Sequence, residues 1–251
     1  MKRLESKTAF VSGGRQGIGR AIVDLFFVEG ATVMTCGRGP RPADLDESIL
    51  WHTMDVGNTY EVSALPERIA AELGELSVLV NNAGIQIEKT LIDTTDEDWD
   101  RLMGTNAKGV FLLCRALIPQ MAVGGSIINI GSVSGNVADP GLALYNASKA
   151  FVHGLTRSIA VDHGPAVRCN AICPGWIMTD MAEAAFSASS NPALAQKDAL
   201  ARHASGRFGM PSDIANMALW LASEESAFAT GQFFTVDGGL TASSPINTTL
   251  F

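Results

Sequence analysis

The sequence predicts an α/β protein, with a doubly wound parallel sheet of seven strands folded as a single domain. Two observations favour this class. Short apolar runs alternate with longer stretches of helical periodicity along the chain. That alternation is typical of a parallel sheet whose helical crossovers cover both faces. No repeat, charge block or low-complexity linker interrupts the sequence, so residues 1–251 are expected to form one domain.

The expected strands are the short apolar runs, and the expected helices are the periodic stretches between them. The strands fall at residues 8–12, 31–36, 49–56, 77–80, 126–130, 167–172 and 233–236, and the helices at 17–29, 59–73, 96–121, 143–163 and 212–223. One crossover is abbreviated, because Pro40 and Pro42 leave room for at most about two helical turns between strands two and three. In such a fold, ligands bind at the carboxyl ends of the strands.

Composition and charge limit the partners of the chain. It is 47% hydrophobic and 18% charged, against an average charged fraction near ~25%. This deficit of charge indicates that other copies of the chain cover part of the surface, so we expect an oligomer. The net charge of −8 argues against binding to nucleic acid or to an anionic membrane, because both are polyanions.

The sequence carries no signal for export or for a metal site. No apolar segment reaches the ~18 residues of a membrane span, and the first residues lack the apolar core of a signal peptide. The cysteines at 36, 114, 169 and 173 form no CxxC pair and no metal-ligand spacing with the four histidines. We therefore expect a cytoplasmic protein with buried free thiols and no metal.

The turn after the first strand has the character of a phosphate-binding loop. Residues 12–19 read Ser-Gly-Gly-Arg-Gln-Gly-Ile-Gly and open an amphipathic helix. Glycines allow the backbone to approach a ligand closely, and the free N–H groups of the helix N-terminus attract a pyrophosphate. The residues expected to hold a dinucleotide here are Gly13, Arg15, Gln16, Gly17, Ile18 and Gly19.

A tyrosine and a lysine lie one turn apart at the start of the helix at 143–163. Tyr145 and Lys149 therefore project from one face, and Ser132 lies just past the end of the strand at 126–130. Reducing a carbonyl requires a proton donor and oxidising an alcohol requires a base, but a phenol with a pKa near ~10 does neither well at neutral pH. A neighbouring ammonium lowers that pKa. We expect Tyr145 to be the acid/base.

The Gly-x-x-x-Gly-x-Gly and Tyr-x-x-x-Lys motifs resemble those of the short-chain dehydrogenase/reductase family, whose fold is Rossmann-type. The resemblance covers essentially the whole chain, in order. It implies a nicotinamide dinucleotide cofactor and further contacts to its adenine and nicotinamide ends. By resemblance, those contacts come from Asp55, Val56, Asn81, Ala83, Gly84, Pro174, Gly175, Ile177 and Thr179.

The resemblance also implies roles for the catalytic residues. Lys149 would bond the nicotinamide ribose and, together with the positive charge of the nicotinamide, stabilise the phenolate of Tyr145 and lower its pKa. Ser132 would orient and polarise the substrate oxygen. Asn106 matches the family's fourth catalytic position, which holds a water and the proton relay to Lys149. Hydride would pass between the substrate and the nicotinamide, so the protein supplies position and proton chemistry.

Relatives in this family bury two helices against copies of themselves, so we expect a homotetramer. The corresponding segments are residues 106–118 and 147–161. More apolar surface is present there than one side of a helix on a sheet requires. The side chains expected to supply it are Val110, Phe111, Leu113, Cys114 and Leu117.

The end of the second strand favours NADP over NAD. An acidic residue at this position accepts hydrogen bonds from the ribose 2′-hydroxyl of NAD and repels a 2′-phosphate. The sequence instead has Gly37 followed by Arg38, whose guanidinium suits a phosphate, with Arg15 and Arg41 as helpers. NAD remains the alternative, because Gln16 stands where many phosphate-binding relatives carry a basic residue.

Substrate selectivity is expected in residues 134–144 and in a mobile lid at 181–210, which cover the nicotinamide. The sequence predicts an apolar pocket, without an arginine clamp for a carboxylate or phosphate, formed by Leu142, Leu144, Trp176, Met181 and Phe186. We expect a small alcohol or ketone, cyclic or aromatic. The alternatives are an NAD-dependent dihydrodiol-type dehydrogenase and a non-catalytic dinucleotide-binding sensor, and the presence of both Tyr145 and Lys149 favours an enzyme.

Overall fold

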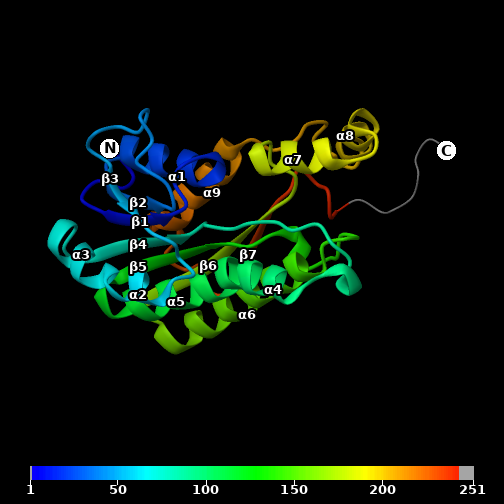
Figure 1. Cartoon of the computed structure of the whole chain (residues 1–251). Coiled ribbons are helices and arrows are strands. Elements are labelled where there is room, and N and C mark those ends of the chain that lie inside the picture. Colours follow the sequence, from blue (N-terminus) through cyan, green and yellow to red (C-terminus); the bar gives the residue numbers. More distant parts are fainter. Residues whose placement is uncertain (1, 243–251) are drawn as a thin grey trace.

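The computed structural model describes residues 2–242, and within them seven parallel strands form one sheet in the order β3-β2-β1-β4-β5-β6-β7 (Figure 1). The expected doubly wound α/β fold is confirmed. The chain builds outward from β1 in one direction to β3 and then in the other direction to β7, which places a topological switch point between β1 and β4. The strands are β1 (Thr8–Ser12), β2 (Thr32–Gly37), β3 (Leu50–Thr53), β4 (Leu76–Asn81), β5 (Met121–Ile130), β6 (Val167–Pro174) and β7 (Phe233–Val236).

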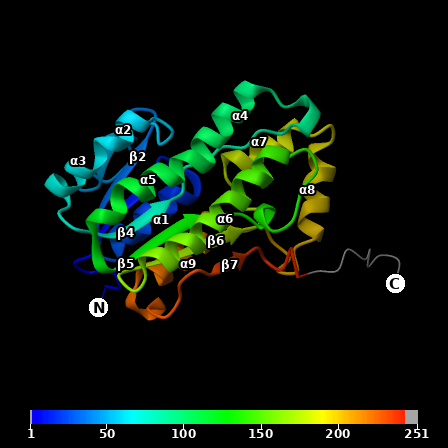
Figure 2. The same ribbon diagram turned by 90° about the horizontal axis from the view of Figure 1, so that it is seen from below.

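Helices cover both faces of the sheet. On one face α1 (Gly17–Val28) and α9 (Pro211–Ala222) lie side by side (Figure 1). Figure 2 shows the opposite face, crossed by α4, α5 and α6. The helices of that face are α2 (Thr59–Ser63), α3 (Leu65–Glu72), α4 (Asp96–Met103), α5 (Gly109–Leu117) and α6 (Ala143–His163), while α7 (Asp180–Ala188) and α8 (Pro192–Ala201) follow β6.

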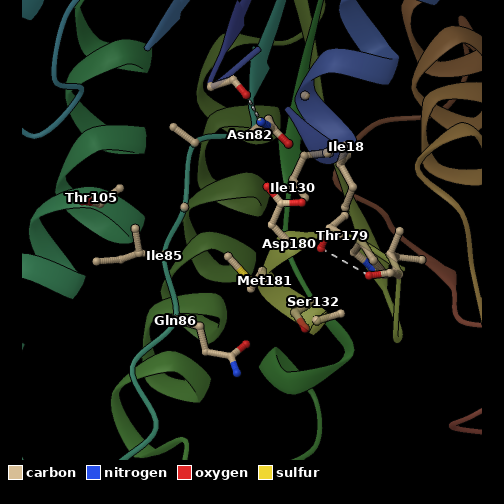
Figure 3. A pocket seen from close by; sticks show the side chains of 18 of the residues that line it. Ile18, Asn82, Ile85, Gln86, Thr105, Ile130, Ser132, Thr179, Asp180 and Met181 are labelled. Carbon is tan, nitrogen blue, oxygen red and sulfur yellow. Dashed lines mark hydrogen bonds between the residues drawn. The ribbon is translucent and has the colours of Figure 1, made fainter. Parts of the chain in front are cut away.

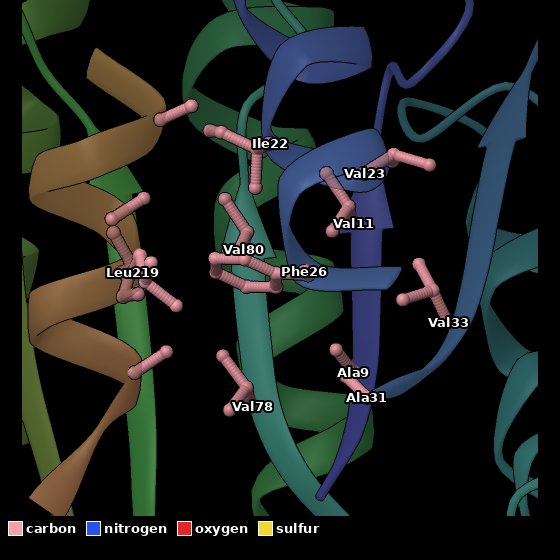
Figure 4. Packing of buried hydrophobic residues seen from close by; sticks show 14 of the residues in the cluster. Ala9, Val11, Ile22, Val23, Phe26, Ala31, Val33, Val78, Val80 and Leu219 are labelled. Carbon is pink, nitrogen blue, oxygen red and sulfur yellow. The ribbon is translucent and has the colours of Figure 1, made fainter. Parts of the chain in front are cut away.

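The core consists of two buried clusters, one on each face of the sheet. In the first, Phe26 of α1 and Leu219 of α9 face Val11 and Val80 of the central strands (Figure 4). The second packs α5 and α6 against the other face and contains Phe10, Leu113 and Val152. Every side chain of β1 after Thr8 is buried, as expected for a strand covered on both faces. This packing fixes the carboxyl ends of the strands, where the site lies.

Two of the expected helices are interrupted. The stretch at 59–73 divides at Ala64 into α2 and α3, because Pro66 lacks an N–H and favours the first turn of a new helix. The stretch at 96–121 divides into α4, a π-helical turn at Gly104–Lys108, α5 and a 3-10 turn at Ile118–Gln120. Single π turns inside helices occur often at functional sites.

Some strand boundaries also differ from the expected ones. β5 begins at Met121, which extends it into residues expected to end a helix. β3 ends at Thr53, before the expected end at residue 56. The abbreviated crossover between β2 and β3 contains turns and no helix within residues 38–49.

The expected oligomer surface is only partly available. Val110, Leu113, Cys114 and Leu117 are buried within the chain's own second core cluster, so they add nothing to an interface. Helix α5 directs these four side chains to the sheet, which is what its amphipathic pattern requires. Of the five expected residues, Phe111 alone is exposed. The apolar groups that do reach solvent nearby are Trp99, Phe111, Phe151 and Val161.

The four cysteines are free and buried, as expected. Burial raises the pKa of the Cys36 and Cys114 thiols to about 12, which keeps them protonated and unreactive. Among residues 2–242, no helix has the length and apolar character needed to cross a bilayer. The same residues contain no group of three His, Cys, Asp or Glu side chains placed to share a metal ion.

Candidate active site

A cavity of about 540 Å³ opens at the carboxyl ends of the central strands. Its wall combines the turn after β1, the ends of β2, β4, β5 and β6, and the first turns of α6 and α7. Figure 3 shows side chains from these segments, among them Ile18, Asn82, Ser132 and Thr179, arranged around one space. The cavity therefore crosses the switch point between β1 and β4, where doubly wound folds bind ligands.

The glycine-rich turn forms one end of this cavity. Gly17 has a φ of +58°, a left-handed conformation that favours glycine, and it begins α1. At Gly19 an added Cβ would lie 2.2 Å from the carbonyl oxygen of Gly13, so the turn closes tightly upon itself. The N-cap residue, Gln16, makes no side-chain cap and the first turn holds no acidic residue. The N–H groups of α1 are thus available to a pyrophosphate, and the turn fits a dinucleotide.

The adenine end of the wall contains most of the residues expected there. Arg38, Asp55, Val56, Ala83 and Gly84 all line the cavity, as do the six expected residues of the turn. A backbone N–H of Gly57 donates to Asp55 Oδ1 at 2.8 Å, which holds the carboxylate in place.

Asn81 lies beneath the cavity, outside its lining. Its amide nitrogen donates to Asn129 Oδ1 at 2.8 Å and to Cys114 Sγ at 3.2 Å, and Asn129 donates onward to Thr156. This buried polar network joins β4, β5 and α6. The neighbouring Asn82 lines the cavity instead and donates to the backbone carbonyls of the glycine-rich turn. The expected direct contact from Asn81 is therefore replaced by a structural role.

The arginines near β2 are not equivalent. Arg38 is exposed on the cavity wall, and Arg15 lies beside it with Nη1 donating to the Pro40 carbonyl at 2.8 Å. Arg41 is turned away and donates to the carbonyls of Leu45, Asp46 and Ile49. The expectation that Arg41 assists in binding a phosphate is wrong, because the abbreviated crossover uses this guanidinium to hold its own backbone.

Tyr145, Lys149 and Ser132 meet on the wall at the other end of the cavity. The Nζ of Lys149 lies 5.5 Å from the centroid of the Tyr145 ring and donates to the Ile130 carbonyl at 2.9 Å. Burial lowers the pKa of Lys149 to about 8. Helix α6 places both side chains on one face, as their spacing predicts.

In the protein alone, the pKa of Tyr145 is raised. Burial raises it to about 12, a nearby Asp139 adds to the increase, and a hydrogen bond with Ser132 opposes it. Lys149 is not among the groups that shift this pKa, and its ammonium donates to the Ile130 carbonyl. An oxidised nicotinamide in the same space would add a positive charge that lowers this pKa.

Two serines follow β5, and their contacts separate their roles. Ser132 bonds Tyr145 and accepts a hydrogen bond from the backbone N–H of Ser134 at 3.1 Å. Ser134 donates its hydroxyl proton to Asp139 Oδ2 at 2.7 Å. Ser132 is thus the serine that faces the phenol, while Ser134 orders the loop that leads to α6.

Asn106 lies in the π-helical turn and is buried behind the cavity wall. Its side chain accepts from the backbone N–H of Ile85 and donates to the Ile85 carbonyl, both at 2.8 Å. It also donates to Ser148 Oγ, next to Lys149 in sequence. Asn106 thereby connects the segment after β4 with the helix that carries Tyr145 and Lys149.

The segment after β6 completes the cavity. Pro174, Gly175, Ile177 and Thr179 all line it, as expected for contacts to the nicotinamide end. Trp176 also lines it and stacks on Phe186 of α7, with ring centroids 4.8 Å apart. Phe186 in turn contacts Phe208, with ring centroids 5.6 Å apart. These aromatic contacts attach residues 181–210 to the segment that follows β6.

The expected substrate pocket is only partly correct. Leu142, Trp176 and Met181 line the cavity, but Leu144 is buried in α6 and Phe186 lies behind Trp176. Three polar side chains on the same wall were not expected from the sequence: Gln86, Asp139 and Asp180. Gln86 and Asp139 lie in loops and Asp180 begins α7, positions where polar residues are common, so nothing in their spacing marked them.

Comparison with known proteins finds relatives that match nearly the whole chain. Residues 13–241 match the family model described as enoyl-(acyl carrier protein) reductase. The chain is 37% identical over 249 residues to a 3-oxoacyl-[acyl-carrier-protein] reductase of Thermotoga maritima, covering 95% of this chain and 99% of the relative. It is 38% identical over 256 residues to the NADP-dependent (R)-specific alcohol dehydrogenase of Lentilactobacillus kefiri, covering 96% and 98% of the two chains.

A solved structure extends the comparison to the fold. The ligand-free aldohexose dehydrogenase of Thermoplasma acidophilum superposes with a TM-score of 0.93 and is 35% identical, covering 98% of both chains. Similarity of sequence and fold thus extends across the cavity and nearly the whole molecule. The chain belongs to the short-chain dehydrogenase/reductase family of oxidoreductases.

Proposed function

We propose that the protein transfers a hydride between NADP and a small uncharged alcohol or ketone. The observation that carries this proposal is the presence of Tyr145, Lys149 and Ser132 on the wall of the cavity that also contains the glycine-rich turn. A dinucleotide held by its pyrophosphate at the N-terminus of α1 would extend toward Tyr145. When bound, the nicotinamide donates or accepts the hydride.

The chain's own groups supply position and the proton. Ser132 donates to the substrate oxygen and holds it against Tyr145, which gives a proton to a developing alkoxide or removes one from an alcohol. With the cofactor bound, Lys149 would contact the nicotinamide ribose and would stabilise the phenolate by its charge. Asn106 fixes the Ile85 segment against α6, and we propose that it also holds a water that relays protons to Lys149.

The cofactor proposed is NADP. Arg38 and Arg15 are the two guanidinium groups on the wall at the adenine end, and Gly37 supplies no carboxylate to repel a phosphate. The kefir relative, named as NADP-dependent, supports the same choice. NAD is the alternative and would be recognised by tighter binding in a direct titration.

The substrate proposed is uncharged. Among the described residues that line the cavity the cationic ones are Arg15, Arg38 and Lys149, of which the arginines lie at the adenine end. The opposite end offers apolar Leu142, Trp176 and Met181 together with acidic Asp139 and Asp180. A carboxylate or phosphate on the substrate would meet no free cation there, so we propose a cyclic or aromatic alcohol or ketone.

We further propose that residues 181–210 are a lid over the substrate, that the enzyme is a homotetramer, and that it acts in the cytoplasm, where its thiols stay reduced. The function is tested with a panel of alcohols and ketones, each followed at the nicotinamide absorbance with NADP(H) and with NAD(H). Turnover with NADP and an uncharged substrate is expected. Tight cofactor binding without turnover of any substrate would instead favour a dinucleotide-binding sensor.

A further inference from the structure

Trp51 of β3 lies across the end of β2. The two strands pair in register, with Trp51 opposite Thr35 and Thr53 opposite Gly37, so the Trp51 and Gly37 positions are diagonal neighbours on one face. A Cβ added to Gly37 would lie 2.8 Å from Cη2 of the indole and 3.3 Å from Cζ2. Carbon atoms in ordinary contact are roughly 3.5–4.0 Å apart. The indole therefore leaves room for glycine and for no side chain at position 37.

The indole is held in this place from two directions. Its Nε1–H donates to Thr53 Oγ1 at 3.2 Å, and the Thr53 hydroxyl donates to the Gly39 carbonyl at 3.2 Å. The ring is partly buried and packs against the core cluster between the sheet and α1. Moving the indole aside would break these two hydrogen bonds and remove its packing against the core cluster.

Arg15 holds the same segment from the other side. Its Nη1 donates to the Pro40 carbonyl at 2.8 Å, and a Cβ on Gly39 would come within 3.0 Å of that nitrogen. Residues 37–40 are thus held from two sides. Trp51 acts on one side through Thr53, and Arg15 acts on the other. Arg38 lies within this segment and is exposed on the cavity wall.

We propose that Trp51 is a positioning residue that determines cofactor choice. First, its ring excludes any acidic side chain from position 37, where a carboxylate would select the ribose 2′-hydroxyl of NAD. Second, it fixes the segment that presents Arg38 to a 2′-phosphate. Trp51 is absent from the cavity lining, so it acts through Gly37 and Arg38. The inference rests on the proposed use of NADP.

The first test measures cofactor affinity in Trp51→Ala by fluorescence titration. We expect the Kd for NADP to rise by roughly three- to tenfold, less than the loss of a full charge-assisted hydrogen bond, while the Kd for NAD stays unchanged. Trp51→Phe, whose shorter ring still packs on the core, should keep more of the preference. Trp220→Phe is the control, because Trp220 packs against Phe234 and does not line the cavity. Equal losses of NADP and NAD affinity would mean that Trp51 is merely structural.

The second test measures the coupling between positions 37 and 51. Gly37→Asp in the presence of Trp51 should weaken both cofactors, whereas Gly37→Asp combined with Trp51→Ala should shift the preference toward NAD by about tenfold or more. A cofactor switch of equal size with and without Trp51 would overturn the proposal.

The smaller substitution Gly37→Ala tests the same steric contact in case the aspartate variant does not fold. It should lower Tm when Trp51 is present and leave Tm nearly unchanged in the Trp51→Ala background. Gly154→Ala, at a position with open space around it, is the matched control. Additive changes in Tm would contradict the steric contact.

If the unaltered protein binds NAD more tightly than NADP, the proposed cofactor is wrong. The coupling between positions 37 and 51 is still measured from the combined variants, so the two failures can be distinguished.

Discussion

The ammonium nitrogen of Lys149 lies 5.5 Å from the centroid of the Tyr145 ring, yet its hydrogen bond goes to the carbonyl of Ile130. In the protein alone, burial has the largest effect on the pKa of Tyr145 and raises it to about 12. The two side chains can be separated experimentally, because Lys149 is proposed to contact the cofactor as well as to stabilise the phenolate.

The first prediction is that Tyr145→Phe abolishes turnover and leaves cofactor binding nearly intact. The change deletes the transferable proton with little loss of side-chain volume, and general acid–base catalysis contributes typically 10²–10⁴-fold, roughly the loss expected here. Steady-state rates and cofactor titration by fluorescence measure the two effects. Retention of about a third of the normal rate would remove Tyr145 from the proposed mechanism.

The second prediction is that Lys149→Ala loses both turnover and cofactor affinity. The buried ammonium is assigned to the nicotinamide ribose and to the phenolate, so its loss should raise the Kd for NADP as well as lower kcat. The same titration used for Tyr145→Phe provides the comparison. Normal affinity in the lysine variant would disprove the ribose contact.

The fold was predictable from the sequence because its signals are local. Each apolar run became a strand, and α6 matches its expected bounds, 143–163. The π-helical turn at Gly104–Lys108 was not predictable, since helical periodicity barely changes when one residue is added to a turn. The start of β5 was missed because Met121 through Gly125 includes two glycines and carries no strand pattern.

At the site, too, local sequence signals were readable and contacts between distant residues were not. Tyr145 and Lys149 are one turn apart, and the glycine-rich turn is continuous, so spacing alone brought them together. Asp139 approaches Tyr145 only through the Ser134 loop. Trp51 approaches Gly37 only through strand pairing. Contacts set by tertiary packing leave no periodic pattern in one sequence.

The third prediction concerns Arg38. Replacing it with aspartate removes the proposed partner of the 2′-phosphate and adds repulsion, so preference should move from NADP toward NAD. One charge-assisted hydrogen bond is worth ~1.5–3 kcal/mol, which corresponds to about tenfold or more in relative affinity. Arg68→Asp is the matched control, because Arg68 lies on α3, pairs with Glu72 and does not line the cavity. Unchanged NADP affinity in Arg38→Asp would show that this arginine only faces solvent.

The fourth prediction is a shift of the pH profile in Asp139→Asn. The negative charge of Asp139 favours the neutral phenol and so raises the pKa of Tyr145. Removing that charge should lower this pKa. Alcohol oxidation requires the phenolate, and the rising limb of kcat/KM against pH should therefore move to lower pH.

The amide can still accept the hydrogen bond that Ser134 donates to Asp139, so the loop should remain ordered. Asp180→Asn is the control, since Asp180 lines the same cavity but is not among the charges that shift Tyr145. An identical profile in Asp139→Asn and in the unaltered enzyme would exclude electrostatic control of Tyr145 by Asp139.

The last prediction is that the protein assembles as a homotetramer through the surface formed by Trp99, Phe111, Phe151 and Val161. These side chains remain exposed, whereas most apolar side chains of α5 are buried, and three of the exposed ones, Trp99, Phe111 and Phe151, line a second cavity on the α4–α6 side. Exposed apolar groups gathered in one place favour burial against another protein surface. Phe151→Asp should shift sedimentation at micromolar concentration toward smaller species, because a carboxylate cannot be buried there without a partner. Val28→Asp, at an exposed position of α1 on the opposite face, should leave the assembly unchanged. A monomer in the unaltered protein would contradict the assembly, whereas a tetramer that survives Phe151→Asp would require a different interface.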